Sequence, residues 1–200
     1  MESYNQCITL QSTVVFNGFG HKQIKISSEM TKQETNQQEV QYRKAIAQDV
    51  ACICQIYNSY VDAGGATFAT DYWKENALAG EIINNPENIW FVAEKDTQII
   101  GWASARLYSS RHGYRLTREL AVYFDLEHVG KGYAYDLVKK TESVCVTHGI
   151  HHLVSRVIAG NQQSLQFHLR CGYEVVGIQR EIGNLNDQWL DVAILQKLIT

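Results

Sequence analysis

The order of strand-like and helix-like segments constrains the fold of this chain more than any other feature of its sequence. Three strand-like runs follow one another at 89–94, 99–108 and 115–124, and the first two are close enough to form a hairpin around Asp96-Thr97. The later segments are a helix at 130–148, a strand at 152–158, a helix at 161–171 and strands at 173–183 and 188–198. This order predicts an α/β domain with a mixed, mostly antiparallel sheet flanked by helices.

The pattern before residue 89 is also regular, but only from residue 41 onward. A short strand at 42–44 leads to Asp49, which we expect to cap a helix that ends at Gly64-Gly65. A second helix is expected over 72–84, where Pro86 stops it. These segments complete a single domain over residues 41–200.

The first 40 residues differ from this domain. Residues 27–39 read SSEMTKQETNQQE, which is the composition of an unfolded segment. Residues 8–16 have strand-like content but no obvious partner. We therefore expect an N-terminal extension over 1–40 that is partly disordered.

Charge and composition exclude several classes of partner. The formal net charge is −3, so no broad electrostatic attraction to nucleic acid or to an anionic membrane is expected. No stretch approaches the roughly 20 apolar residues that span a bilayer, and the N-terminus lacks the order of a secretory signal. We expect a cytoplasmic protein.

The cysteines do not suggest a disulfide framework or a metal site. They number five, an odd count, and no CxxC pair occurs, so no metal is expected. Cys52 and Cys145 fall on apolar helix faces and are interpreted as buried. Cys171 is weighed as a nucleophile and disfavoured, because no base lies at a convincing offset.

The segment Glu-His-Val-Gly-Lys-Gly-Tyr-Ala at 127–134 joins a strand to a helix. Glycines at the start of a helix let the backbone approach a ligand closely, and the free N–H groups there favour an anion. Lys131 adds a positive charge, so a pyrophosphate is the natural ligand. The alternative is a tight turn without a ligand.

This loop resembles the pyrophosphate-binding loop of the GNAT acetyltransferases, Gln/Arg-x-x-Gly-x-Gly/Ala, with Val129, Gly132 and Ala134 at the three specified positions. Val129 departs from the pattern. The segment 158–173 is similar to the GNAT strand-to-helix segment, which implies that Asn161 contacts the pantetheine arm of coenzyme A. His168 lies where many members carry a tyrosine that acts as general acid. The alternatives are a helix cap for Asn161 and a satisfied interior histidine for His168.

The stretch from Tyr42 to about Leu198 is similar to one GNAT branch, the phosphinothricin and methionine-sulfoximine N-acetyltransferases. The matching pieces are Ile56-Tyr57-Asn58, Ala66-Thr67-Phe68, Arg111 to Glu119, Ala121-Val122-Tyr123 and Trp189-Leu190-Asp191. The resemblance implies the GNAT fold, a homodimer, and transfer of the acetyl group of acetyl-CoA to the primary amine of a small amino-acid-like substrate by direct attack in a ternary complex. It implies acetyl-CoA contacts from Val122, Tyr123, Phe124, Val129, Gly130, Lys131, Gly132, Tyr133, Ala134 and Asn161.

The strand expected at 115–124 carries the candidate chemistry. In a regular strand Arg115, Thr117 and Glu119 share one face, and polar residues on a central strand indicate either a cleft or a row of salt bridges. Glu119 matches the general base proposed for the branch, with His168 assisting it or the leaving group. The alternative for Glu119 is an ion pair with Arg115 or Arg118. Backbone N–H groups near Val122 and Phe124 would polarise the acetyl carbonyl.

Arg111, Tyr114 and Arg115 are assigned to the substrate, because arginine pairs bidentately with a carboxylate. Exposed surface arginines are the alternative, and Phe68 is expected to wall the side-chain pocket. Leu185 and Asp187 replace a lysine and a glycine that are frequent in the branch, so the substrate can differ from phosphinothricin. Two other functions stay open: a peptide or protein N-terminal acetyltransferase, and a coenzyme A-binding module without turnover, which the departure at Val129 would favour.

Overall fold

The computed structural model describes residues 13–16, 22–25 and 39–200. In the N-terminal unit, β1 (Thr13–Phe16) and β2 (Lys22–Lys25) form an antiparallel pair, so the strand-like run near β1 has a partner in β2. The expectation that this extension is partly disordered falls on residues outside the described ranges.

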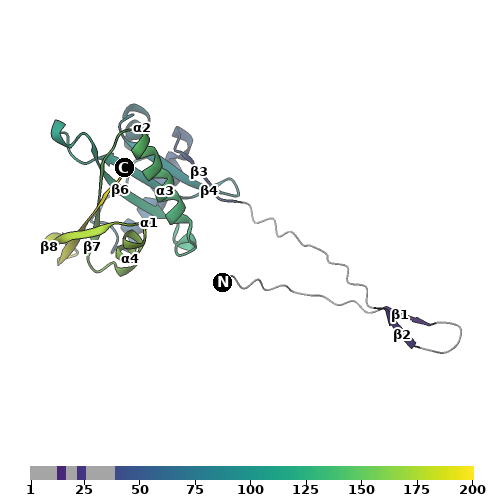
Figure 1. The fold of residues 1–200 in the computed structure, drawn as a ribbon. Helices are drawn as coiled ribbons and strands as arrows, with labels where there is room; N and C mark the ends of the chain where they lie inside the picture. The colour runs from purple at the N-terminus through teal and green to yellow at the C-terminus, as the bar shows by residue number, and fades with distance from the viewer. Residues whose placement is uncertain (1–12, 17–21, 26–38) are drawn as a thin grey trace. The chain divides into compact units, whose positions relative to one another are not determined.

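The second unit is built on a seven-stranded sheet with the order β3-β4-β5-β6-β7-β9-β8 (Figure 1). All neighbouring strands are antiparallel except β6 and β7, which are parallel. This confirms the mixed, mostly antiparallel sheet. The strands are β3 (Gln41–Lys44), β4 (Ile89–Lys95), β5 (Gln98–Leu107), β6 (Thr117–Phe124), β7 (His152–Ile158), β8 (Glu174–Leu185) and β9 (Gln188–Leu198).

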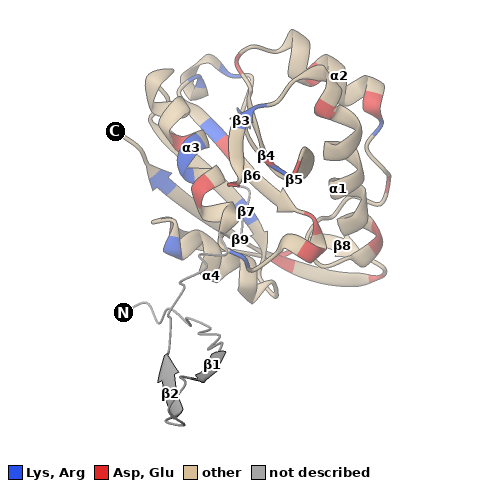
Figure 2. Cartoon of the chain, turned by 90° about the vertical axis from the view of Figure 1, so that its right-hand side faces the viewer, with Lys and Arg blue, Asp and Glu red and all other residues tan. Residues whose placement is uncertain are grey.

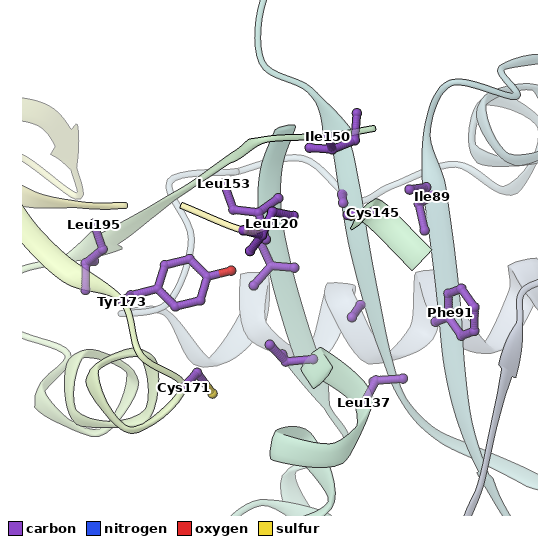
Figure 3. Packing of buried hydrophobic residues seen from close by; sticks show 14 of the residues in the cluster. Ile89, Phe91, Leu120, Leu137, Cys145, Ile150, Leu153, Cys171, Tyr173 and Leu195 are labelled. Atoms are coloured by element: carbon purple, nitrogen blue, oxygen red, sulfur yellow. The ribbon is translucent and has the colours of Figure 1, made fainter. Parts of the chain in front are cut away.

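Helices cover both faces of the sheet, with α1 (Val50–Ala63) and α2 (Glu75–Asn84) on one side and α3 (Tyr133–Thr147) on the other (Figure 2). A large apolar cluster fills the space between the strands and α3, and Figure 3 shows Leu137 and Cys145 of that helix among side chains from the strands. A second cluster joins α1 and α2 to Trp90 and Trp102 on the opposite face. No helix in the described part of the chain is long and apolar enough to cross a lipid bilayer.

The capping of α1 and the start of α2 differ from expectation for tertiary reasons, and α3 begins at Tyr133 instead of residue 130 because Gly130 and Gly132 have positive φ values. Asp49 precedes α1 but does not cap it, because its carboxylate accepts hydrogen bonds from the Arg43 guanidinium at 2.7 and 2.8 Å and from the Ile46 N–H at 2.9 Å. The α2 helix begins at Glu75, three residues later than expected. The Trp73 N–H just before it donates to the Asn58 side chain of α1 at 2.8 Å, which holds this segment outside the helix.

Two further expectations need correction. Cys145 is buried as expected, but Cys52 is partly exposed, and Cys54 takes the buried position on α1. The strand expected at 115–124 is β6, and it begins at Thr117. Arg115 lies before it, after a 3-10 turn, and donates its N–H to the His112 carbonyl at 3.1 Å. Arg115 therefore does not share the face of β6 that carries Glu119.

Candidate active site

Strands β6 and β7 separate and open the sheet. Their parallel pairing covers only Thr117 to Glu119, although β6 continues to Phe124 and β7 continues to Ile158. On the β5 side the register of β6 is continuous, so no bulge interrupts this strand. A cavity of about 830 Å³ lies at the opening, within the size range of small-molecule and cofactor sites.

The glycine-containing loop borders this cavity. Gly130 and Gly132 have φ values of +80° and +90°, a region that glycine adopts readily and other residues rarely do. Gly132 is the N-cap of α3. Within residues 39–200, no hydrogen bond engages the N–H groups of residues 129–132. Free N–H groups at the start of a helix suit a phosphate or pyrophosphate group.

The side chains of this loop divide into two groups. Val129, Gly130, Gly132 and Ala134 line the cavity, whereas Lys131 and Tyr133 are not among the lining residues. Lys131 is exposed, and Tyr133 packs against the large core with its ring 5.8 Å from the Lys95 ammonium. The backbone of the loop, more than its charged side chain, therefore faces the cavity.

Asn161 lies across the opening from the glycine loop, at the start of α4 (Gln162–Arg170). Its Oδ1 accepts the Ser164 N–H at 3.0 Å, so it caps the helix, which was the alternative interpretation. Its amide nitrogen makes no hydrogen bond to any described residue. Capping one end of the amide and contacting a ligand with the other end are compatible.

His168 lines the cavity from about two turns further along α4 and is buried. Its Nδ1 lies 2.8 Å from the Ser164 carbonyl oxygen. A carbonyl only accepts, so Nδ1 carries the proton and Nε2 has a free lone pair. Burial lowers the pKa of His168, although the hydrogen bond to the Ser164 carbonyl opposes this shift. The side chain is therefore a neutral imidazole that can accept a proton at Nε2.

Glu119 stands at the last position where β6 and β7 pair. Both of its carboxylate oxygens accept hydrogen bonds from Arg156 of β7, at 2.7 and 2.8 Å. An ion pair was one interpretation of Glu119, but its partner is neither Arg115 nor Arg118. Arg118 is buried on the other face of the strand and donates to backbone carbonyls, including that of Glu87 at 3.1 Å.

Aromatic side chains form the wall of the cavity beside Glu119. Tyr57 stacks on Trp73 with 3.8 Å between ring centroids, and Trp102 stacks on Tyr123 at 4.9 Å. Of these four, only Tyr123 was predicted as a site residue. Tyr60 was also missed, although its hydroxyl donates to the Phe124 carbonyl at 2.6 Å at the end of β6.

Among the predicted substrate residues, Phe68 lines the cavity. Its ring packs so closely on the β8 backbone that a Cβ added at Gly183 would overlap it. Arg111, Tyr114 and Arg115 lie on the loop before β6 and are not among the lining residues, and the Tyr114 ring packs edge-on against Tyr108 at 5.4 Å. The structure therefore brings Phe68 to the same cavity as Glu119 and His168, but not the three residues of this loop.

Three arginines that the sequence did not single out line the cavity: Arg170 at the end of α4 and, on the strands, Arg106 of β5 and Arg156 of β7. The two strand arginines are the charged residues in mostly apolar strands, and that break in the pattern was the signal available in the sequence. Cys171 is buried and outside the cavity, and burial raises the pKa of its thiol to about 11, which does not suit a nucleophile. No group of His, Cys, Asp or Glu side chains in the described ranges is arranged to hold a metal ion.

Comparisons with known proteins agree with this geometry. The model of the acetyltransferase (GNAT) domain family matches residues 43–194. The phosphinothricin N-acetyltransferase of Alcaligenes faecalis is 28% identical over 153 residues, which are 74% of this chain and 77% of the relative. The L-methionine sulfoximine/L-methionine sulfone acetyltransferase of Pseudomonas aeruginosa is 28% identical over 166 residues, 77% of this chain and 91% of the relative.

A solved structure with the same fold is that of a GNAT superfamily phosphinothricin acetyltransferase from Sinorhizobium meliloti in complex with acetyl-CoA. It superposes with a TM-score of 0.75 at 27% sequence identity and covers 80% of this chain and 88% of its own. The described sheet and helices therefore have a counterpart that binds acetyl-CoA.

Proposed function

This chain belongs to the GNAT acetyltransferase family, and we propose that it moves the acetyl group of acetyl-CoA to the primary amine of a small amino-acid-like substrate. The observation that carries the proposal is the opening between β6 and β7, with the free N–H groups of the glycine loop on one side and Glu119 at its closed end. Amino acids of the methionine sulfone, methionine sulfoximine and phosphinothricin type are the proposed substrates, because relatives are named for them.

The residues at the opening fit acetyl-CoA. The N–H groups of residues 129–132 and the N-terminus of α3 suit its pyrophosphate, and a Cβ at Gly130 or Gly132 would meet no atom within 4 Å, so space is free beside them. The free amide nitrogen of Asn161 can donate to the pantetheine arm. Because β6 is unpaired beyond Glu119 on its β7 side, its edge around Val122 and Phe124 can offer N–H groups to the cofactor. Acetyl-CoA supplies the thioester carbonyl that the amine attacks.

We assign the role of general base to Glu119. An α-amine has a pKa near ~8, so only a minor fraction is unprotonated at neutral pH. Both Glu119 oxygens already accept from Arg156, so the carboxylate must exchange one of these hydrogen bonds for the ammonium or for a bridging water. Arg156 is exposed enough for such an exchange, with 58% of its side chain accessible.

His168 is the second proton-handling group of the proposal. Its neutral imidazole has a free Nε2 lone pair and lines the same cavity. It can therefore accept a proton released by the amine, or hold a water between the amine and Glu119, without itself carrying charge beforehand. A direct attack of the amine on the thioester within a ternary complex needs no covalent enzyme intermediate.

We also propose that the chain forms a homodimer through the edge of the sheet at β8. Among the described strands this one pairs with β9 alone, and apolar side chains along both strands are exposed. The residues are Val175, Val176, Ile178, Ile182 and Trp189. Because Ile182 also lines the cavity, a partner molecule at this edge would help to shape the substrate site.

A thiol-release assay with acetyl-CoA tests the proposed function. The amines are free amino acids, methionine sulfone, methionine sulfoximine, phosphinothricin and short peptides. Release with at least one free amino acid or analogue is expected. Release with peptides alone would identify an N-terminal acetyltransferase, and tight coenzyme A binding without release would identify a binding module without turnover.

A further inference from the structure

Arg106 is the cross-strand neighbour of Glu119. The register of β5 and β6 pairs the two residues directly. Trp102 and Ser104 precede Arg106 on the same face of β5. Directly opposed residues have Cβ atoms about 4.5–5.5 Å apart. Arg106 and Glu119 therefore enter the cavity side by side, from neighbouring strands.

Arg106 differs from Arg118 and Arg156, the other arginines next to Glu119, because its guanidinium donates no hydrogen bond to any described residue. Glu119 gives both oxygens to Arg156, and Arg118 donates to backbone carbonyls on the opposite face. Within residues 39–200, the Arg106 guanidinium has no carboxylate partner. It lies 6.0 Å from the centroids of the Trp73 and Trp90 rings instead.

Buried donors without partners lie near Arg106. The indole N–H groups of Trp90 and Trp102 are buried and have no acceptor among the described residues. The rings of these two residues lie 5.4 Å apart, and the Trp90 ring is the one that faces the Arg106 guanidinium, at 6.0 Å. A half-buried cation against an aromatic wall, with unsatisfied donors behind it, favours an anionic ligand.

We propose that Arg106 binds the carboxylate of the acetyl acceptor and that the acceptor is an α-amino acid with a largely apolar side chain. The proposal rests on the function proposed above. In an α-amino acid one carbon separates the amine from the carboxylate, which suits neighbouring groups at Glu119 and Arg106 on paired strands. A planar guanidinium can hold the carboxylate bidentately. The rings of Tyr57, Trp73 and Tyr123 then surround the side chain.

The test compares an amino acid with its α-amide, which keeps the amine and the side chain but lacks the carboxylate. The probes are the best amino acid from the thiol-release panel and its α-amide, and the variants are Arg106→Met and Arg106→Lys. With Arg106→Met, kcat/KM for the acid should fall about 10- to 100-fold, mainly through KM, while kcat/KM for the amide changes little. Arg106→Lys should recover part of the preference for the acid.

Control variants separate this role from general damage. Lys140→Met removes one positive charge from the exposed face of α3 and should leave the acid-to-amide ratio unchanged. The dissociation constant of acetyl-CoA should be the same in wild type and Arg106→Met. An unchanged acid-to-amide ratio in Arg106→Met, or a loss of the ratio in Arg111→Met alone, would overturn the proposal while the acetyltransferase function stands. A wild-type protein that releases no thiol with any amine would overturn both.

Discussion

Two interactions compete for the carboxylate of Glu119. The ion pair with Arg156 uses both oxygens, while the proposed chemistry needs a lone pair on one of them. The exposed Arg156 side chain resolves this conflict, because a solvated ion pair is weak and exchanges readily. Glu119 is thus held in place by Arg156 and is still accessible to an amine or a water in the cavity.

We expect the substitution Glu119→Gln to lower kcat about 10²- to 10⁴-fold, because an amide retains the shape of the side chain but cannot accept the ammonium proton. The dissociation constant of acetyl-CoA should not change, since the glycine loop lies at the other end of the cavity. Steady-state kinetics and calorimetric titration of acetyl-CoA measure the two quantities. Glu75→Gln, an exposed carboxylate at the start of α2, is the matched control. Wild-type kcat in Glu119→Gln at neutral pH would remove Glu119 from the mechanism.

His168 should make the stability of the protein depend on pH. Burial lowers its pKa in the folded state. Below about pH 6.5 the histidine is therefore protonated to a larger extent in the unfolded chain than in the folded protein. Its contribution to stability is therefore fully present above the unfolded pKa and is lost as pH falls through the folded pKa. One such group changes the free energy of unfolding by at most about 1.4 kcal/mol per pH unit.

Urea unfolding of wild type and His168→Gln between pH 7.5 and about 5 measures this effect. The free energy of unfolding should fall less steeply with decreasing pH in the variant, because glutamine does not titrate. The six other histidines are common to both proteins and cancel in the difference. Parallel pH profiles would mean that His168 does not take up a proton on unfolding in this range.

Sequence reasoning found those site residues that a local pattern marks. The glycine loop, Asn161 and His168 stand in short segments with a recognisable spacing, and the structure brings them to one cavity with Glu119. Arg106 and Arg156 have no such local pattern. Their importance follows from strand register, which pairs Arg106 with Glu119 and aligns β7 with β6, and register between distant segments cannot be read from one sequence.

At the level of elements, the turn before α3 connects backbone conformation to function. Gly132 has both a positive φ and the N-cap position, so its backbone decides where the first N–H groups of the helix point. An added Cβ would meet open space, which means that any cost of a side chain arises from the backbone angle and not from a clash.

Gly132→Ala should therefore lower the free energy of unfolding by about 1–3 kcal/mol and raise the KM for acetyl-CoA, with little change in the KM for the amine. The strain can also shift the turn, which would move the N–H groups away from the pyrophosphate. Gly113→Ala is the control, because this glycine also has free space around it but no positive φ. Thermal unfolding measures the loss of stability in each variant, and steady-state kinetics measure the KM for acetyl-CoA and for the amine. Equal behaviour of both variants would argue against a special role for the backbone at Gly132.

The existence and order of the elements could be predicted well, while several of their starts could not. Alternating and helical apolar patterns report which segments are buried, and these predicted every strand of the seven-stranded sheet. The starts at Thr117 and Glu75 depend on interactions with other parts of the chain. The loop before β6 makes its own 3-10 turn, and the loop before α2 is held by Asn58 of α1. Neither contact leaves a periodic signal in the sequence.

At the scale of the whole molecule, the exposed feature is the edge of the seven-stranded sheet at β8. Val176, Ile178 and Ile182 are 57%, 50% and 56% accessible on a single edge strand, and Trp189 on β9 is 64% accessible. Isolated apolar residues on a surface are common, but an apolar edge strand tends to pair with another chain. A second copy of this chain is the proposed partner.

Introducing a charge at this edge should separate the two copies. In Ile178→Lys, association would bury an ammonium group without a partner, so the variant should elute as a monomer while wild type has twice the chain mass in size-exclusion chromatography with light scattering. Ile83→Lys places the same charge on α2 at a side chain that is 58% accessible, and it should remain dimeric. The monomeric variant should also bind the amine more weakly, because Gln179, Ile182 and Asn184 of β8 line the cavity and would lose their support. A dimer in both variants would place the interface elsewhere, and a monomeric wild type would leave the β8 edge without its proposed partner.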